Sequence, residues 1–123
     1  MSEKPFIEVP QGPAPTELQI IDEVVGDGPE ASRGSTVDVD YVGVGWDSGK
    51  QFDASYDRGE PLTFRLGVGQ VIKGWDAGVQ GMRVGGRRKL LIPSDQVYGR
   101  RGIPGVIGRN EALIFVCELR AVR

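Results

Sequence analysis

Residues 71–79, with the sequence VIKGWDAGV, present a tryptophan in a setting that favours binding of an apolar ring. Ile72, Trp75 and Val79 share one side of a short helix, because their spacing is i, i+3, i+7. Two glycines interrupt this helix at ~1 kcal/mol each relative to alanine, so another group must approach its backbone closely. A helix of about two turns is not stable alone. We therefore predict that a sheet encloses it and that Trp75 forms the floor of a cavity.

Several catalytic chemistries are excluded by residue type. The sequence has no histidine and one cysteine, Cys117, so imidazole catalysis and a His- or thiolate-ligated metal cannot occur. Cys117 lies within an apolar face and is predicted to be a core residue. Residues 67–74 lack the glycine spacing and the Gly-Lys-Ser/Thr of phosphate-binding loops. Asp38, Asp40 and Asp47 lack calcium-loop spacing and are expected to be solvated. We expect no metal and no cofactor.

Length and composition indicate one globular domain. The chain has 123 residues, of which 39% are hydrophobic and 26% charged. It shows no secretory signal and no apolar run long enough for a membrane span. A single cysteine cannot form an internal disulfide, which fits a reducing cytoplasm. We expect a cytoplasmic monomer that binds neither nucleic acid nor membranes.

Charge is distributed unevenly between the two halves of the chain. Residues 1–60 hold 4 basic and 13 acidic side chains, a net charge of −9, whereas residues 61–123 hold 11 basic and 4 acidic ones, net +7. One interpretation is a basic surface around residues 87–89 and 100–101 that meets an acidic partner. The favoured alternative is that the two halves interleave in one sheet and neutralise each other across strands.

The sequence predicts an N-terminal arm followed by an α+β domain with a mostly antiparallel sheet. Residues 1–16 contain four prolines and are predicted to be extended, whereas residues 17–123 form the domain. We expect residues 6–9 to lie against it, with a disordered tail as the alternative. Alternating patterns predict strands at residues 18–25, 36–42, 61–67, 87–93 and 112–120. Five strands and one short helix without βαβ alternation favour an α+β fold.

Several motifs occur in an order that resembles the FKBP-type peptidyl-prolyl cis-trans isomerases, the immunophilin family that binds tacrolimus and rapamycin. These motifs are VDYVG at 39–43, GKQFDAS at 49–55, residues 66–79, QGMRVG at 80–85, YG at 98–99, IPGVI at 103–107 and LIFVCEL at 113–119. The resemblance covers roughly residues 18–123. The resemblance implies a five- or six-stranded, mostly antiparallel sheet wrapped around one short helix, with the active site between them.

The resemblance also implies site residues. The catalytic residues would be Tyr41, Asp53, Tyr98 and Phe115. The substrate-binding residues would be Phe52, Arg58, Leu62, Gln70, Val71, Ile72, Trp75, Ile103, Val106 and Ile107. Asp53 would lie at the rim near the Tyr41 hydroxyl with Arg58 as its ionic neighbour. The Tyr98 hydroxyl and the Ile72 main chain would bond the peptide.

Three positions depart from the family pattern. Leu62 stands where an aromatic residue is frequent, so one pocket wall should be less flat. Gln70 replaces a frequent acidic residue and should alter the charge near the rim. Ile103 replaces a polar residue of some relatives and makes that loop more apolar.

The function implied is catalysis of rotation about X-Pro peptide bonds in an aromatic pocket, which assists protein folding. Desolvation would favour the twisted imide, and this chemistry needs no nucleophile or metal. Proline-containing peptides and proteins would be the partners, and tacrolimus and rapamycin the inhibitors. The alternative is a proline-binding or chaperone module with little turnover.

Overall fold

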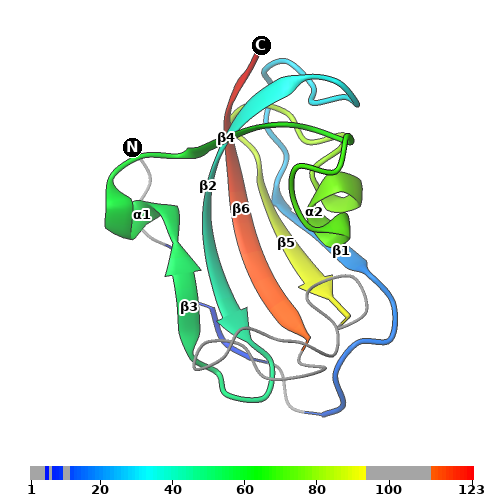
Figure 1. The fold of residues 1–123 in the computed structure, drawn as a ribbon, viewed down its shortest axis with the longest axis vertical. Coiled ribbons are helices and arrows are strands. Elements are labelled where there is room, and N and C mark those ends of the chain that lie inside the picture. The colour runs from blue at the N-terminus through cyan, green and yellow to red at the C-terminus, as the bar shows by residue number, and fades with distance from the viewer. Residues whose placement is uncertain (1–4, 6, 10–11, 94–111) are drawn as a thin grey trace.

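The computed structural model describes Pro5 and residues 7–9, 12–93 and 112–123 (Figure 1). In these residues the elements are β1 (Gln19–Val24), β2 (Thr36–Gly45), β3 (Gln51–Ala54), α1 (Ser55–Arg58), β4 (Leu62–Arg65), α2 (Lys73–Gly78), β5 (Arg87–Ile92) and β6 (Leu113–Val122). All strand pairs are antiparallel, in the order β1-β5-β6-β2-β3. The expected α+β fold is confirmed, and β3 and α1 are elements that the alternation of the sequence did not predict.

β2 and β6 are ten-residue strands that form the centre of the sheet. Their pairing runs from Val37 opposite Val122 to Gly45 opposite Leu113. The other edge of β2 is shared, because β4 pairs with its first half and β3 with its second. β6 comes last in sequence and nevertheless lies between β5 and β2. In the chain, α1 and residues 59–61 connect β3 to β4.

Helix α2 packs against one face of the sheet, over β5 (Figure 1). A Cβ atom at Gly74 would lie 2.6 Å from Ile92, and one at Gly78 would lie 2.6 Å from Leu90. Both glycines therefore let the helix backbone meet β5 side chains directly. The close approach predicted from the two glycines is confirmed, and the group that approaches is the sheet itself.

The main core lies between α2 and the sheet. Its largest fully buried side chains include Leu66, Val79, Leu90, Ile92 and Leu119, and Cys117 is fully buried among them. Burial raises the pKa of the Cys117 thiol well above its usual range. Cys117 is thus the core residue that the sequence predicted.

The opposite face of the sheet is also covered, partly by the N-terminal arm. Ile7 is 8% exposed and belongs to a second buried cluster with Val42, Ile114 and Val116, and Val9 packs against that cluster. The expectation that residues 6–9 lie against the domain is confirmed for the described residues Ile7 and Val9. The arm boundary at residue 16 stays a prediction.

The expectation that Asp38 and Asp40 are solvated is wrong. Their side chains are 12% and 14% exposed and pair with Arg123 and Arg120, respectively. The register of β6 beside β2 is the reason, because it places these C-terminal arginines next to the two aspartates. Asp38 also accepts a hydrogen bond of 2.7 Å from the Thr63 hydroxyl.

Ion pairs join the acidic first half of the chain to the basic second half. Besides the pairs of β2 with β6, Arg88 of β5 lies 2.6 Å from Asp22 of β1. The sheet order places β5 and β6 of the second half between β1 and β2 of the first half, so charges of the two halves pair at the β1–β5 and β6–β2 contacts, as the favoured interpretation predicted. The described residues contain no helix long and apolar enough to cross a membrane.

Candidate active site

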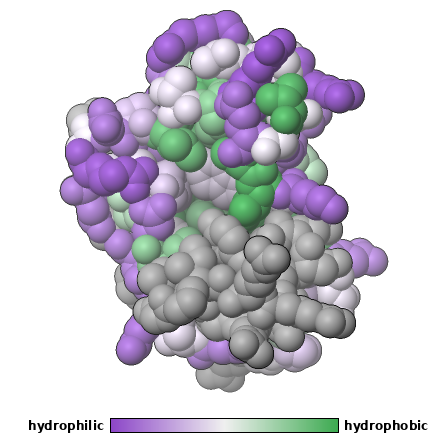
Figure 2. All heavy atoms as spheres, in the orientation of Figure 1, coloured by the Kyte–Doolittle hydropathy of each residue, from purple (hydrophilic) through white to green (hydrophobic). Residues whose placement is uncertain are grey.

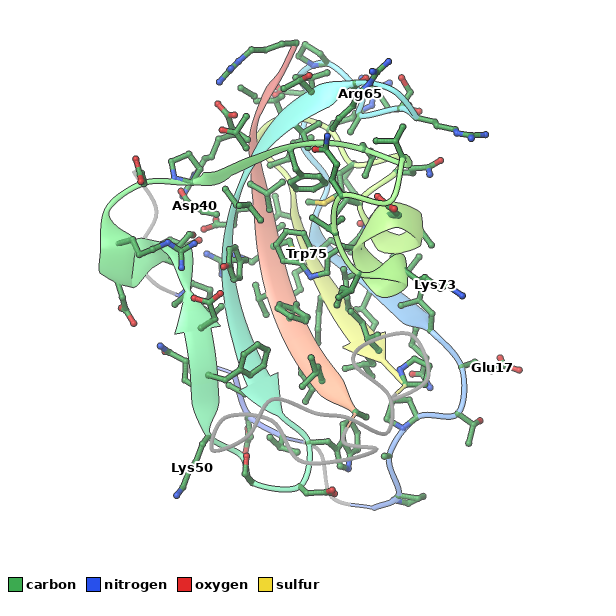
Figure 3. All side chains as sticks on the ribbon, in the orientation of Figure 1. Glu17, Asp40, Lys50, Arg65, Lys73 and Trp75 are labelled. Atoms are coloured by element: carbon green, nitrogen blue, oxygen red, sulfur yellow. The ribbon has the colours of Figure 1, made fainter. Side chains whose placement is uncertain are left out.

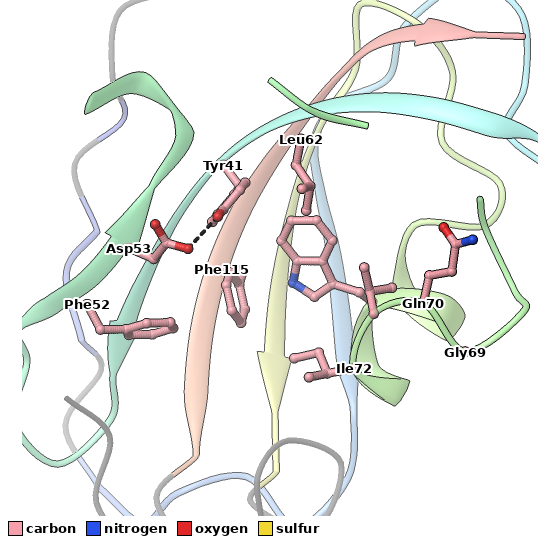
Figure 4. A pocket seen from close by; sticks show the side chains of 10 residues that line it. Tyr41, Phe52, Asp53, Leu62, Gly69, Gln70, Ile72 and Phe115 are labelled. Atoms are coloured by element: carbon pink, nitrogen blue, oxygen red, sulfur yellow. Dashed lines mark hydrogen bonds between the residues drawn. The ribbon is translucent and has the colours of Figure 1, made fainter. Parts of the chain in front are cut away.

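A hollow of about 440 Å³ opens between the sheet, α2 and the segment that leads into this helix (Figure 4). Its lining is mostly apolar and consists of Tyr41, Phe52, Asp53, Leu62, Gly69, Gln70, Val71, Ile72, Trp75 and Phe115. In the space-filling view, hydrophobic residues lie beside this hollow, and hydrophilic residues lie above it and to both sides (Figure 2). Such a site suits a compact apolar group flanked by polar atoms.

Trp75 lies between α2 and the central strands, with only 3% of its surface exposed (Figure 3). Its ring is nearly perpendicular to those of Tyr41 and Phe115, with centroid distances of 4.9 and 5.3 Å. Phe64 of β4 packs beside it at 5.6 Å. Edge-to-face pairs of this kind stabilise a fixed ring orientation. The indole is therefore a rigid floor.

The indole N–H of Trp75 is buried and makes no conventional hydrogen bond among the described residues. A buried donor without an acceptor usually costs ~1–3 kcal/mol. The perpendicular aromatic neighbours offer π faces, which are weak acceptors. This position thus holds a tryptophan despite the cost of its buried N–H, which suits a site that needs a large flat surface.

The wall formed by Phe52 and Phe115 depends on a glycine in β2. The two rings meet edge to face at 5.5 Å. A Cβ atom at Gly43 would lie 2.7 Å from an atom of each ring. Only a residue without a side chain lets both rings lie against this strand, and a glycine directly after the alternating run at residues 36–42 was the signal that could have predicted it.

Three polar side chains form the rim above Phe52. The Tyr41 hydroxyl donates a hydrogen bond to Asp53 (Figure 4). It accepts one of 3.0 Å from Arg58 Nη2. Arg58 Nη1 donates to the other oxygen of Asp53 at 2.7 Å. Burial raises the pKa of the Tyr41 phenol to about 12, and the hydrogen bond to Asp53 acts in the same direction. Tyr41 is therefore a neutral phenol at physiological pH, and the rim is a closed hydrogen-bonded triangle.

Ser55, the first residue of α1, supports this rim through two hydrogen bonds to β2. Its hydroxyl accepts a hydrogen bond of 2.7 Å from the Tyr41 N–H and donates one of 2.7 Å to Asp40 Oδ1. Asp40 in turn accepts a bond of 2.8 Å from Arg120 Nε. Because Arg58 ends α1, the same network fixes both the strand of Tyr41 and the helix of Arg58.

The loop before α2 is fixed by Asp76. Its carboxylate accepts backbone N–H bonds from Gly67 and Gly69, at 2.8 and 2.9 Å. Both glycines have positive φ, at 81° and 82°, which favours glycine. Gln70 directs its amide oxygen to the Arg65 N–H at 2.8 Å. These bonds set the position of the main chain that enters α2 at Ile72.

The structure brings together nine of the predicted site residues in the lining of the hollow: Tyr41, Phe52, Asp53, Leu62, Gln70, Val71, Ile72, Trp75 and Phe115. Arg58 reaches the site through its bonds to Tyr41 and Asp53. Tyr98, Ile103, Val106 and Ile107 lie outside the described residues. Sequence reasoning missed the supports that Ser55 and Asp76 provide, because neither residue lies in the lining.

Comparison with known proteins assigns the chain to a family. Residues 28–120 match the family described as FKBP-type peptidyl-prolyl cis-trans isomerase. The chain is 57% identical over 121 residues to the FK506-binding protein of Streptomyces anulatus, which covers 98% of both chains. It is 53% identical over 107 residues to FK506-binding protein 1A of Neurospora crassa, covering 86% of this chain and 88% of that protein.

Solved structures of proteins with similar sequences share the fold of this chain. The crystal structure of AtFKBP13 superposes with a TM-score of 0.79 and 44% identity, over 89% of this chain and 96% of that one. FkpA from Escherichia coli superposes with a TM-score of 0.77 and 42% identity, over 86% of this chain and 48% of that one. With the family match extending over most of the chain and the fold shared, the chain belongs to the FKBP-type peptidyl-prolyl cis-trans isomerases.

Proposed function

We propose that the hollow over Trp75 binds the proline ring of a substrate and favours the twisted form of the preceding peptide bond. Rotation about a peptide bond has a barrier of ~18–20 kcal/mol because resonance gives it partial double-bond character. X-Pro bonds populate both isomers, and their uncatalysed exchange takes ~10–100 s at 25 °C. The observation that carries the proposal is an apolar hollow with a buried indole as its floor.

Desolvation supplies the driving force in this proposal. The planar imide is stabilised by charge separation and by hydrogen bonds with water, and twisting removes that charge separation. A site that replaces water by the rings of Phe52, Trp75 and Phe115 therefore disfavours the planar form more than the twisted form. Each tenfold increase in rate needs only ~1.4 kcal/mol of differential binding.

The rim has a positioning role in this mechanism. The triangle of Tyr41, Asp53 and Arg58 satisfies its own hydrogen bonds and presents a fixed polar edge beside the apolar hollow. The main chain at Ile72 would bond the substrate backbone on the opposite side. We retain Tyr98 as the proposed donor to a substrate carbonyl.

The proposed substrates are proline-containing peptides and unfolded or folding proteins, acted on by a monomer. Tacrolimus and rapamycin are the proposed inhibitors. Support comes from the relatives named FK506-binding proteins, since FK506 is tacrolimus. The hollow has the volume and apolar lining that an inserted ring needs.

A protease-coupled isomerisation assay with a Leu-Pro peptide tests the proposal. We expect acceleration that rapamycin abolishes and EDTA leaves unchanged. Asp53→Ala should lower turnover without unfolding the protein, because its pair with Arg58 is solvent-exposed and such pairs contribute under ~1 kcal/mol. Asp27→Ala, an exposed carboxylate outside the hollow, is the matched control.

Two results would contradict the proposal. Binding of rapamycin without any acceleration would identify a proline-binding module instead of a catalyst. Loss of activity with EDTA would require a metal that the mechanism does not contain.

A further inference from the structure

β1 is an edge strand whose backbone pairs on one side only. It is hydrogen-bonded to β5, and no other described strand pairs with it (Figure 1). All six of its residues are exposed. An edge strand offers unpaired N–H and C=O groups to any extended chain, and proteins usually block it with lysine or proline. β1 contains neither residue.

Exposed aliphatic side chains concentrate on this edge. Among the described residues, five large hydrophobic side chains are exposed, and four of these lie in β1 or directly after it. They are Ile20, Ile21, Val24 and Val25, with 45%, 44%, 52% and 74% of their surfaces exposed. Clustered exposure of this kind is typical of an interaction surface.

The same edge is acidic. Residues 17–30 contain five acidic side chains and no lysine or arginine. Arg88 neutralises Asp22, whereas Glu17, Glu23 and Asp27 are exposed. Glu17 points away from the sheet at the flank where β1 begins (Figure 3). A partner with basic side chains would therefore be attracted.

β5 shows which sequence β1 accepts as an antiparallel neighbour. Leu90 lies opposite Ile20, Lys89 opposite Ile21 and Arg88 opposite Asp22. Strand side chains stand above and below the sheet, so a strand on the free edge would meet the same β1 side chains. The sequence of β5, RRKLLI, is thus a template for a ligand of the free edge.

We propose that β1 binds an extended segment of another protein as an added antiparallel strand, with basic side chains beside the exposed Glu17, Glu23 and Asp27 and an aliphatic residue opposite Ile20. This is the strand-addition mode of peptide recognition. A second copy of this chain is disfavoured as the occupant, because pairing of two β1 strands would bring their acidic side chains together.

This strand site is separate from the proline site, because no residue of β1 lines the hollow. A client that carries both a proline and a basic, aliphatic segment could engage both sites at once. The first contact would then raise the effective concentration of the second, which increases avidity without any new contact in the hollow.

NMR titration of the isotope-labelled full chain with the capped peptide RRKLLI tests the proposal. We expect the largest shift changes and slowed amide exchange at residues 19–25, with no inhibition of isomerisation of a short substrate. The same peptide N-methylated at alternate residues should not bind, because it cannot donate the strand hydrogen bonds; this arm needs no protein variant.

Protein variants supply a second arm. Ile21→Lys combined with Glu23→Lys should weaken binding by roughly tenfold through lost apolar contact and like-charge repulsion. Glu60→Lys, at an exposed acidic residue outside β1, should change affinity less than about twofold. If both variants weakened peptide binding equally, or if the methylated peptide bound, the binding would be a non-specific attraction between charges. Either result would overturn the proposal. Protection of residues 19–25 that rises with protein concentration alone would overturn it in favour of a second copy.

Discussion

Ser55 and Asp40 hydrogen-bond across the junction between α1 and β2, with 2.7 Å between the Ser55 hydroxyl and Asp40 Oδ1. Ser55 is fully buried, and the same hydroxyl accepts the Tyr41 N–H. One side chain thus satisfies a strand donor and a carboxylate at once. This arrangement joins the aromatic rim to the ion pair of Asp40 with Arg120.

Ser55→Ala should lower the free energy of unfolding by ~1–3 kcal/mol, because it removes the acceptor of the buried Tyr41 N–H and the donor to Asp40 Oδ1. Urea denaturation measures the change. Ser32→Ala, at an exposed serine, should change stability by less than ~0.5 kcal/mol. Equal stability of the Ser55 variant would mean that water replaces the hydroxyl in the network.

Leu62→Phe should tighten both tacrolimus and rapamycin. Leu62 is partly buried at the wall of the hollow, and an aromatic ring there adds ~0.5–1.5 kcal/mol beyond its area, or roughly three- to tenfold in affinity. Titration followed by Trp75 fluorescence reports the dissociation constants. Weaker binding by this variant would show that the larger side chain fills the hollow.

Gly74→Ala tests the contact between α2 and β5. The added methyl group would lie 2.6 Å from Ile92, and overpacking of this kind costs ~1–3 kcal/mol, against a gain of ~1 kcal/mol in helix propensity. We expect a net loss of stability in thermal denaturation. Gly74→Ala combined with Ile92→Ala should show a favourable coupling between the two sites. A more stable single variant would contradict the packing described.

Alkaline pH should destabilise the protein through its buried phenols. The Tyr41 pKa rises from 10.0 to about 12 on burial, and burial with the hydrogen bond to Glu118 also raises the pKa of Tyr56. The unfolded chain therefore releases these protons at lower pH than the folded chain. The stabilisation is complete below about pH 10 and is lost as pH rises toward 12.

Denaturant unfolding at pH 8 to 11 measures this dependence. Tyr41→Phe should reduce the slope of stability against pH above pH 10, although the variant loses its hydrogen bond to Asp53 at every pH. An unchanged slope in the variant would assign the pH dependence to other groups.

Ile7→Ala should lower the melting temperature by several degrees, because a buried isoleucine replaced by alanine costs ~2 kcal/mol or more. Ile7 is 8% exposed on the face of the sheet opposite α2. Glu8→Ala, at the exposed neighbouring position, is the control. Equal melting temperatures for Ile7→Ala and the parent would show that the arm contributes no stability.

Alternation of side chains predicted five of the six strands, because the face packed on α2 is apolar. The same rule was wrong for the opposite face, where Asp38 and Asp40 were assigned to water. Their partners Arg123 and Arg120 are 85 and 80 residues away in sequence, so only the register of β6 beside β2 reveals the pairs. β3 and α1 have four residues each, too few for a periodic signal.

Ten of the fourteen predicted site residues lie in the lining of the hollow or at its rim, because the motifs that contain them fold around α2, and the other four lie outside the described residues. Trp75, Phe115 and Tyr41 line the hollow as the resemblance implied. The supports of Ser55 and Asp76 could not be predicted, since a serine or an aspartate is common on any surface. Their importance comes from hydrogen bonds that depend on the folded backbone.

The central place of β6 has a consequence for synthesis on the ribosome. β2 and β5 share this strand as their common neighbour, and it is the last of the described elements to be translated. The sheet therefore cannot close on a nascent chain until residues 113–122 have emerged from the ribosome. Before that point Asp40 and Asp38 lack their partners Arg120 and Arg123, and a nascent chain of residues 1–60 carries a net charge of −9. Mutual repulsion between such nascent chains would oppose their aggregation while the sheet lacks its centre.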